Sequence, residues 1–113
     1  MSDEYTIPKE LLARCVGKTE LVQRVLAAFV KQLDNDIPKL TADLRAGDFE
    51  GAAKTAHRVK GAAANVAADG LRASAERIED LARNPQIDDV PAHVNQLQED
   101  WNKFVELTAK FLG

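Results

Sequence analysis

The apolar residues of this chain recur every three or four positions, and this spacing constrains the fold more than any other feature. Residues at this spacing lie on one face of an α-helix, whereas a half-buried strand would alternate apolar and polar residues. The longest such stripe comprises Val22, Leu26, Phe29, Leu33, Ile37, Leu40 and Leu44. It predicts a long amphipathic helix from Thr19, in which Pro38 is expected to cause a kink or a short break.

Turn-forming residues indicate where the helices should end. Gly47 is expected to end the first long helix, and Asp48 is expected to cap the start of the next. Asp69-Gly70 predicts a second turn, Asn84-Pro85 predicts a third, and the last helix should begin at about Val90. The inward positions between these turns are Phe49, Ala52, Ala56, Val59, Ala63, Val66, Leu71, Ala75, Ile78, Ala82, Val94, Leu97, Trp101, Phe104, Thr108 and Phe111.

Four amphipathic helices with short connections predict an all-α fold, an antiparallel four-helix bundle. A short additional N-terminal helix near residues 8–15 should cover one end. The 113 residues suffice for one modest core, so we expect a single domain with residues 1–18 as an N-terminal cap and 19–112 as the bundle. A bundle by itself does not define a function.

Composition excludes several classes of protein. The net charge of -3 argues against a general nucleic-acid-binding protein. Cys15 is the single cysteine, so the chain can form no internal disulfide, and it offers no cysteine-based metal site. No apolar segment is long enough for a membrane span, and the polar start "MSDEYTIPKE" does not resemble a signal peptide. We expect a cytoplasmic protein without a metal or another cofactor.

Two short features carry little functional weight. The "GKT" at 17–19 would belong to a phosphate-binding loop only if glycine stood at position 12, which is Leu12. Gly17 is therefore expected to form a bend, and Thr19 is expected to act as a helix N-cap. His93 falls in the first turn of the last helix, where a lone histidine is usually solvated.

The segment "TAHRVKGAAANVA" at 55–67 carries a histidine inside an alanine-rich helix. At about 100° per residue, His57 lies opposite the inward stripe that contains Val59 and Ala63. His57 should therefore point outward rather than into the core. This phase leaves open whether the histidine has a role or is only solvated.

Gly61 and Lys60 share the side of the helix on which His57 lies. Glycine within a helix costs roughly 1 kcal/mol relative to alanine, although alanine fills the next three positions. Gly61 therefore indicates either a helix end or a need for clearance beside the imidazole. Lys60 lies one turn from His57, where its ammonium could neutralise a phosphoryl group on the ring, or could simply be solvated.

The sequence around His57 resembles the histidine-containing phosphotransfer (HPt) domain family. The family pattern is approximately A-H-x-L-K-G-x-A-x-N, followed by a leucine and an L-E pair. Here the corresponding segments are "AHRVKGAAANVAADGL" and "ASAERIEDL", and the resemblance covers about residues 19–81. Val59 stands in place of leucine, Ala67 in place of a common glycine, and Ile78-Glu79 in place of Leu-Glu.

The resemblance implies a phosphorelay intermediate rather than an enzyme. His57 would carry a phosphoryl group between aspartates of receiver domains in two-component signalling, with Lys60 and Gly61 supporting it. The implied partners are a response-regulator receiver domain, which would supply Mg²⁺, and a hybrid sensor histidine kinase. We expect a monomer, either a free-standing shuttle or a domain of a hybrid kinase. The alternative is a non-catalytic helical adaptor that binds a signalling partner through the same face.

The resemblance also suggests which residues surround the imidazole. In some family members a glutamine within "F-x-x-Q" bonds the ring; the matching residue here is Gln32, which could equally be a solvated surface amide. A flat docking face for the partner is expected around His57. Its predicted members are Ala53, Lys54, Arg58, Ala64 and Ala68.

Overall fold

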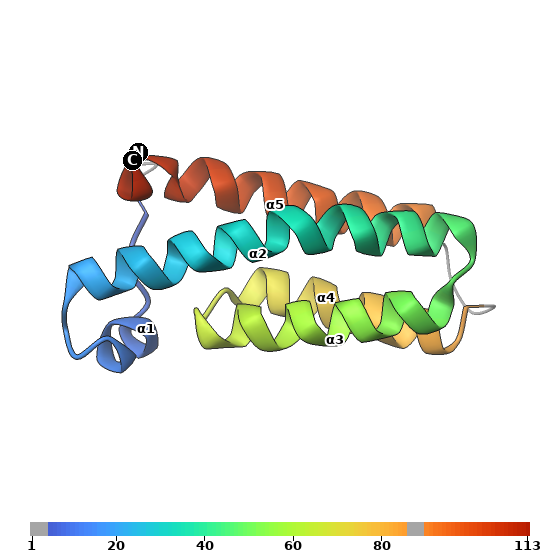
Figure 1. The fold of residues 1–113 in the computed structure, drawn as a ribbon, viewed down its shortest axis with the longest axis horizontal. Coiled ribbons are helices and arrows are strands. Elements are labelled where there is room, and N and C mark those ends of the chain that lie inside the picture. The colour runs from blue at the N-terminus through green and yellow to red at the C-terminus, as the bar shows by residue number, and fades with distance from the viewer. Residues whose placement is uncertain (1–4, 86–89) are drawn as a thin grey trace.

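The computed structural model describes residues 5–85 and 90–113. These residues form the helices α1 (Lys9–Arg14), α2 (Thr19–Ala46), α3 (Phe49–Asn65), α4 (Asp69–Arg83) and α5 (Val90–Leu112). The four long helices lie side by side, and the short α1 lies at one end (Figure 1). The predicted four-helix bundle with an additional N-terminal helix is confirmed.

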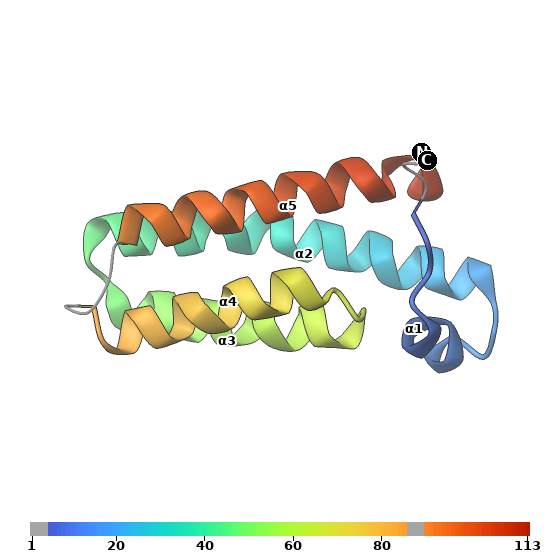
Figure 2. The same ribbon diagram turned by 180° about the vertical axis from the view of Figure 1, so that it is seen from behind.

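Each long helix packs against two others, and this arrangement closes the bundle. α3 lies between α2 and α4, while α5 packs against α4 and α2. Seen from behind, α4 and α5 lie in front of α3 and α2 (Figure 2). Because α3 has a neighbour on either side, its buried face is wider than a single stripe, and its opposite face stays open to solvent.

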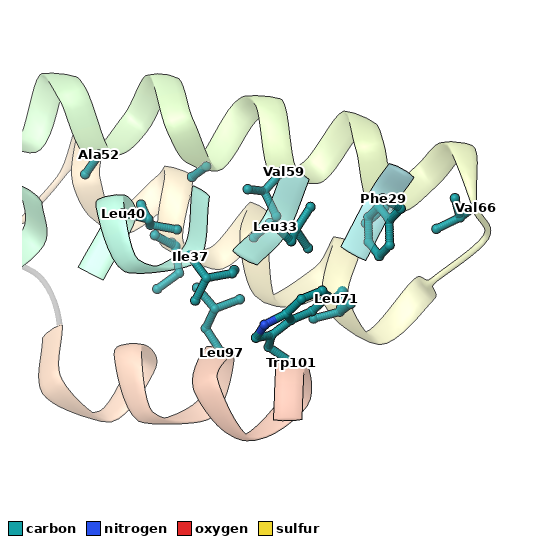
Figure 3. Close-up of a cluster of buried hydrophobic side chains, with 14 of the residues drawn as sticks. Phe29, Leu33, Ile37, Leu40, Ala52, Val59, Val66, Leu71, Leu97 and Trp101 are labelled. Atoms are coloured by element: carbon teal, nitrogen blue, oxygen red, sulfur yellow. The ribbon is translucent and has the colours of Figure 1, made fainter. Parts of the chain in front are cut away.

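The predicted apolar stripes form the core between the helices. Every predicted inward position of α2 is buried, and so are the inward alanines and valines of α3. Figure 3 shows side chains of α2, α3, α4 and α5 gathered in this core. Trp101 is buried, and its ring meets that of Phe29 edge to face, with the ring centres 6.0 Å apart.

α2 continues through Pro38, so the short break is wrong, and the kink that was its alternative stays a prediction. Proline removes one N–H donor from the helix, but a helix can continue through it where packing against other helices holds the backbone. Pro38 is exposed, whereas Ile37 and Leu40 are both buried in the core. The predicted end of α2 is confirmed, because its C-cap is Gly47 with φ +78°. The predicted cap of α3 is also confirmed, because the side chain of Asp48 accepts a hydrogen bond from the backbone N–H of Gly51.

The turn between α3 and α4 falls earlier than predicted. α3 ends at Asn65, and Asp69 already belongs to the first turn of α4. The backbone N–H groups of Ala67 and Ala68 donate to the carbonyls of Ala64 and Ala63, which is the Schellman arrangement of a helix end. Ala67 takes the left-handed position of this motif with φ +55°, a conformation that glycine adopts at lower cost.

A side chain of α1 completes the C-terminal end of α3. Nη1 of Arg14 donates to the carbonyl oxygens of Asn65 at 2.6 Å and Ala64 at 3.2 Å. The last turn of α3 contains no basic residue, so Arg14 supplies the positive charge that a helix C-terminus favours. α1 is thus tied to the helix that carries His57.

The connection between α1 and α2 differs from the prediction by one residue. The predicted bend is confirmed, because Gly17 adopts φ +72°. The N-cap of α2 is Lys18, however, and Thr19 is the first helical residue. The "GKT" segment therefore forms a turn between two helices.

Candidate functional site

His57 lies in the middle of α3 on its open face, and 67% of its side-chain surface is exposed. Val59 and Ala63 on the opposite face are fully buried. The predicted outward orientation of His57 is therefore confirmed. The core does not use this imidazole, so one side of the ring is open to a partner.

Glu79 of α4 is the residue that holds the imidazole. Its Oε2 lies 3.1 Å from Nδ1 of His57. The same carboxylate binds Nζ of Lys60 at 2.7 Å through Oε1 and Nη2 of Arg83 at 2.9 Å through Oε2. Only 8% of the Glu79 side chain is exposed, so this cluster of three donors surrounds a buried acceptor.

The cluster keeps Glu79 ionised. The hydrogen bond from Lys60 outweighs the burial of the carboxyl and, together with Arg83, lowers the pKa of Glu79 from 4.5 to about 2. The same hydrogen bond raises the pKa of Lys60. Both groups are therefore charged at neutral pH, and the carboxylate can only accept hydrogen bonds.

This charge state assigns the proton of a neutral imidazole. Because Glu79 is an acceptor only, the Nδ1 atom that faces it must be the donor. The proton of the neutral ring then lies on Nδ1, and the lone pair lies on Nε2. No residue among those described hydrogen-bonds to Nε2, and 67% of the His57 side-chain surface is exposed.

Gln32 does not hold the imidazole, contrary to the prediction. Its Nε2 donates to Oδ2 of Asp36 at 3.2 Å within α2. The rotation of α3 directs His57 toward α4, where Glu79 occupies the orienting position instead. The sequence did contain a signal for Glu79, since this residue is the acid of the Ile78-Glu79 pair.

Arg58 connects the open face of α3 to α2. Its Nη2 and Nε atoms donate to Oδ1 and Oδ2 of Asp36 at 2.8 and 3.2 Å. Burial opposes the ionisation of Asp36, but the hydrogen bonds from Arg58 and Gln32 outweigh it, so the pKa of Asp36 is lowered. Arg58 was predicted only as a docking residue, whereas it is also an interhelical contact and is 55% exposed.

Among the described residues, none lies so close to Gly61 that a side chain there would collide with it. A Cβ atom added there would meet nothing within 4 Å. α3 continues beyond it to Asn65, so the alternative that Gly61 ends the helix is wrong. The remaining interpretation of Gly61 is that it leaves space beside the imidazole for a group that does not belong to the described residues, such as a partner's surface.

The predicted docking residues fall into two groups. Lys54 and Ala64 are exposed on α3, as expected. Ala53 is only 7% exposed, so its prediction as a surface residue is wrong, because α3 packs against two helices. Ala68 is half-buried in the turn after α3, so the helical phase that placed it beside His57 does not extend that far.

Other candidate chemistry is not assembled near His57. His93 is half-buried on α5, and α5 is not a main neighbour of α3. Within residues 5–85 and 90–113, no cluster of three or more histidine, cysteine or acidic residues is placed to bind a metal. In the same part of the chain, no helix is long and apolar enough to cross a membrane.

The chain was compared with protein families, with curated proteins and with solved structures. Residues 24–106 match the family described as Hpt domain. Neither the curated proteins nor the solved structures gave a significant match. The family match covers most of the chain, including His57 and Glu79, and the Hpt domain is a four-helix bundle like the one described above. The chain therefore belongs to the Hpt domain family.

Proposed function

We propose that this chain is a phosphoryl carrier in a phosphorelay and that Nε2 of His57 is the atom that bears the phosphoryl group. The family is consistent with this role. The observation that carries the assignment is the hydrogen bond between Nδ1 and the ionised, buried Glu79, which leaves a lone pair on an exposed Nε2.

The transfer requires no general base on this chain. The Nε2 lone pair attacks phosphorus in the aspartyl phosphate of a receiver domain, so a P–N bond forms while the P–O bond to the carboxylate breaks. The aspartate leaves as a carboxylate, and the ring retains its proton on Nδ1. The positive charge that develops on the ring is stabilised by Glu79, 3.1 Å from Nδ1.

Lys60 and Gly61 would support the phosphoryl group in different ways. Lys60 and His57 bind the same carboxylate, so the Lys60 ammonium lies near the ring and can turn from Glu79 toward phosphoryl oxygens. Gly61 leaves open space one turn after His57. Mg²⁺ and the acidic pocket that aligns the phosphoryl group would come from the receiver.

The docking face would consist of exposed residues around His57 on α3, with Lys54, Arg58 and Ala64 as members. A response-regulator receiver domain and a hybrid sensor histidine kinase are the partners proposed for this face. The guanidinium of Arg58 is held by Asp36, so it is presented to the partner in a fixed orientation. We propose that the carrier acts as a monomer in the cytoplasm.

The test is to incubate the purified chain with a receiver domain that carries a labelled aspartyl phosphate. We expect acid-labile, alkali-stable label on the chain, as phosphohistidine gives. The label should be absent from His57→Gln and present on His93→Gln, the matched variant of the other histidine. Label that persists on His57→Gln would overturn the site assignment.

The adaptor alternative makes the opposite prediction in the same experiment. An adaptor would bind a receiver without acquiring label, and His57→Gln would bind as tightly as the wild type. Binding can be followed by titration calorimetry with the same receiver domains. Binding without label for every receiver of the source organism would favour the adaptor over the carrier.

A further inference from the structure

Arg83 binds the same oxygen of Glu79 that holds His57. Its Nη2 atom lies 2.9 Å from Oε2, whereas Lys60 binds the other oxygen, Oε1. Arg83 is in the last turn of α4, one turn after Glu79. Each oxygen of this carboxylate therefore has its own cation, and Oε2 also accepts the hydrogen bond from Nδ1.

Cations on both oxygens fix the plane of the Glu79 carboxylate, because rotation about the Cγ–Cδ bond (χ3) would break both contacts. That torsion is broad in an unrestrained glutamate. Without Arg83, the carboxylate of Glu79 could rotate to face Lys60. The contact between Lys60 and Oε1, at 2.7 Å, is shorter than the contact between His57 and Oε2, at 3.1 Å. Oε2 would then move away from Nδ1, and the proton of the neutral ring would be shared between its two nitrogens.

We propose that Arg83 is a positioning residue that acts through Oε2 of Glu79 to keep the proton of neutral His57 on Nδ1 and the lone pair on Nε2. This inference rests on the proposed function, since the lone pair matters only if Nε2 is the nucleophile. Arg83 also provides a cation that stays with Glu79 when Lys60 turns toward a phosphoryl group. The orienting hydrogen bond to His57 is thereby kept in both states of the carrier.

An ordinary surface ion pair is the competing explanation, because opposite charges four residues apart slightly stabilise many helices. The burial of the acid distinguishes the two cases. The Glu79 side chain is 8% exposed, so water cannot readily replace a lost donor. The Arg72–Glu76 pair on the same helix joins side chains that are 40% and 50% exposed, and it provides the matched control.

The experiment measures the tautomer of His57 in the unphosphorylated full chain. The histidines are labelled with ¹⁵N, their signals are assigned with His93→Gln, and two-bond ¹H–¹⁵N spectra are recorded at a pH where the ring is neutral. We expect the wild type to be mainly Nδ1–H. In Arg83→Gln the fraction of rings protonated on Nδ1 should fall by a factor of about two or more, since the partner of a ring nitrogen sets the tautomer. Arg83→Lys should restore most of it.

The Arg72→Gln control removes the same charge and the same type of helical pair, and it should keep the wild-type tautomer. An unchanged tautomer in Arg83→Gln would overturn the proposal. The rate of phosphoryl transfer from a receiver should fall by the same factor as the Nδ1–H fraction, and a normal rate with a changed tautomer would also overturn it. The spectra need no partner protein. An unchanged tautomer therefore counts against the role of Arg83 alone, whereas a wild type that acquires no label counts against the proposed function.

Discussion

Arg58 binds Asp36 through two nitrogen atoms, Nη2 at 2.8 Å and Nε at 3.2 Å, and so joins α3 to α2 immediately beside His57. On the other side of the same helix, Glu79 of α4 binds His57 and Lys60. Two buried carboxylates from different helices therefore hold the exposed face of α3. Together they tie the exposed face of α3 to the helix on either side, and Glu79 holds the imidazole toward α4.

Replacement of Asp36 should loosen this arrangement. Asp36→Asn removes a buried charged acceptor, so Arg58 loses its bidentate contact with a carboxylate. We expect the free energy of unfolding to fall by about 1–2 kcal/mol, as for a lost hydrogen bond to a charged group. Urea denaturation measures the change. Asp34→Asn, at an exposed position of α2, is the control and should stay within about 0.5 kcal/mol of the wild type.

Lys60 should determine how long the phosphoryl group survives on His57. Lys60→Ala removes the ammonium that would neutralise phosphoryl oxygens, so the half-life of the phosphorylated carrier should shorten severalfold. The half-life is measured as loss of label after the receiver has been removed. Lys54→Ala removes a lysine three residues before His57, where the side chain pairs with Glu50, and it should keep the wild-type half-life. Equal half-lives in both variants would contradict the role of Lys60.

Gly61 allows two substitutions with different expected outcomes. Gly61→Ala places a Cβ atom in open space, so it should raise the free energy of unfolding by about 1 kcal/mol through helix propensity. Gly61→Arg should keep the helix content but lower the rate of transfer at least tenfold, because a long side chain would obstruct the partner. Circular dichroism and transfer kinetics measure the two effects. Normal transfer by Gly61→Arg would show that clearance is not needed there.

The ionisation of Glu79 should make the free energy of unfolding depend on pH in the acid range. Its pKa is lowered in the folded chain from 4.5 to about 2, so the unfolded chain binds a proton first as the pH falls. The contribution is therefore complete above about pH 4.5 and is lost as the pH falls toward 2. Glu79→Gln should show a shallower decline of unfolding free energy over this range. Glu76→Gln, on the exposed part of the same helix, should decline as the wild type does.

Ala67 should be a site at which glycine stabilises the fold. Its left-handed backbone, φ +55°, costs an alanine about 1–2 kcal/mol, whereas glycine adopts it freely. Glycine is also more flexible in the unfolded chain, so we expect a net gain of about 1 kcal/mol for Ala67→Gly. Ala64→Gly, within α3, should instead lose about 1 kcal/mol. Thermal denaturation of both variants measures the difference, and a less stable Ala67→Gly would contradict the strain.

The residues that were mispredicted show where sequence patterns stop being informative. Ala53 was expected on the surface because the helical phase described one inward stripe, but α3 packs against two helices and buries a second row. Ala68 was assigned to a helix that ends earlier, because an alanine occupies the left-handed position normally taken by glycine. In both cases the local pattern was sound, but the neighbouring structure determined the outcome.

The sequence by itself determined the four long helices and the outward direction of His57, because the helical period fixes which residues share a face without reference to any neighbour. The tertiary structure alone decided what holds the imidazole. The sequence analysis proposed only Gln32, whereas the rotation of α3 between α2 and α4 brought Glu79 to Nδ1 and left Gln32 with Asp36. That rotation depends on how side chains of three helices pack together, which no single helical stripe encodes.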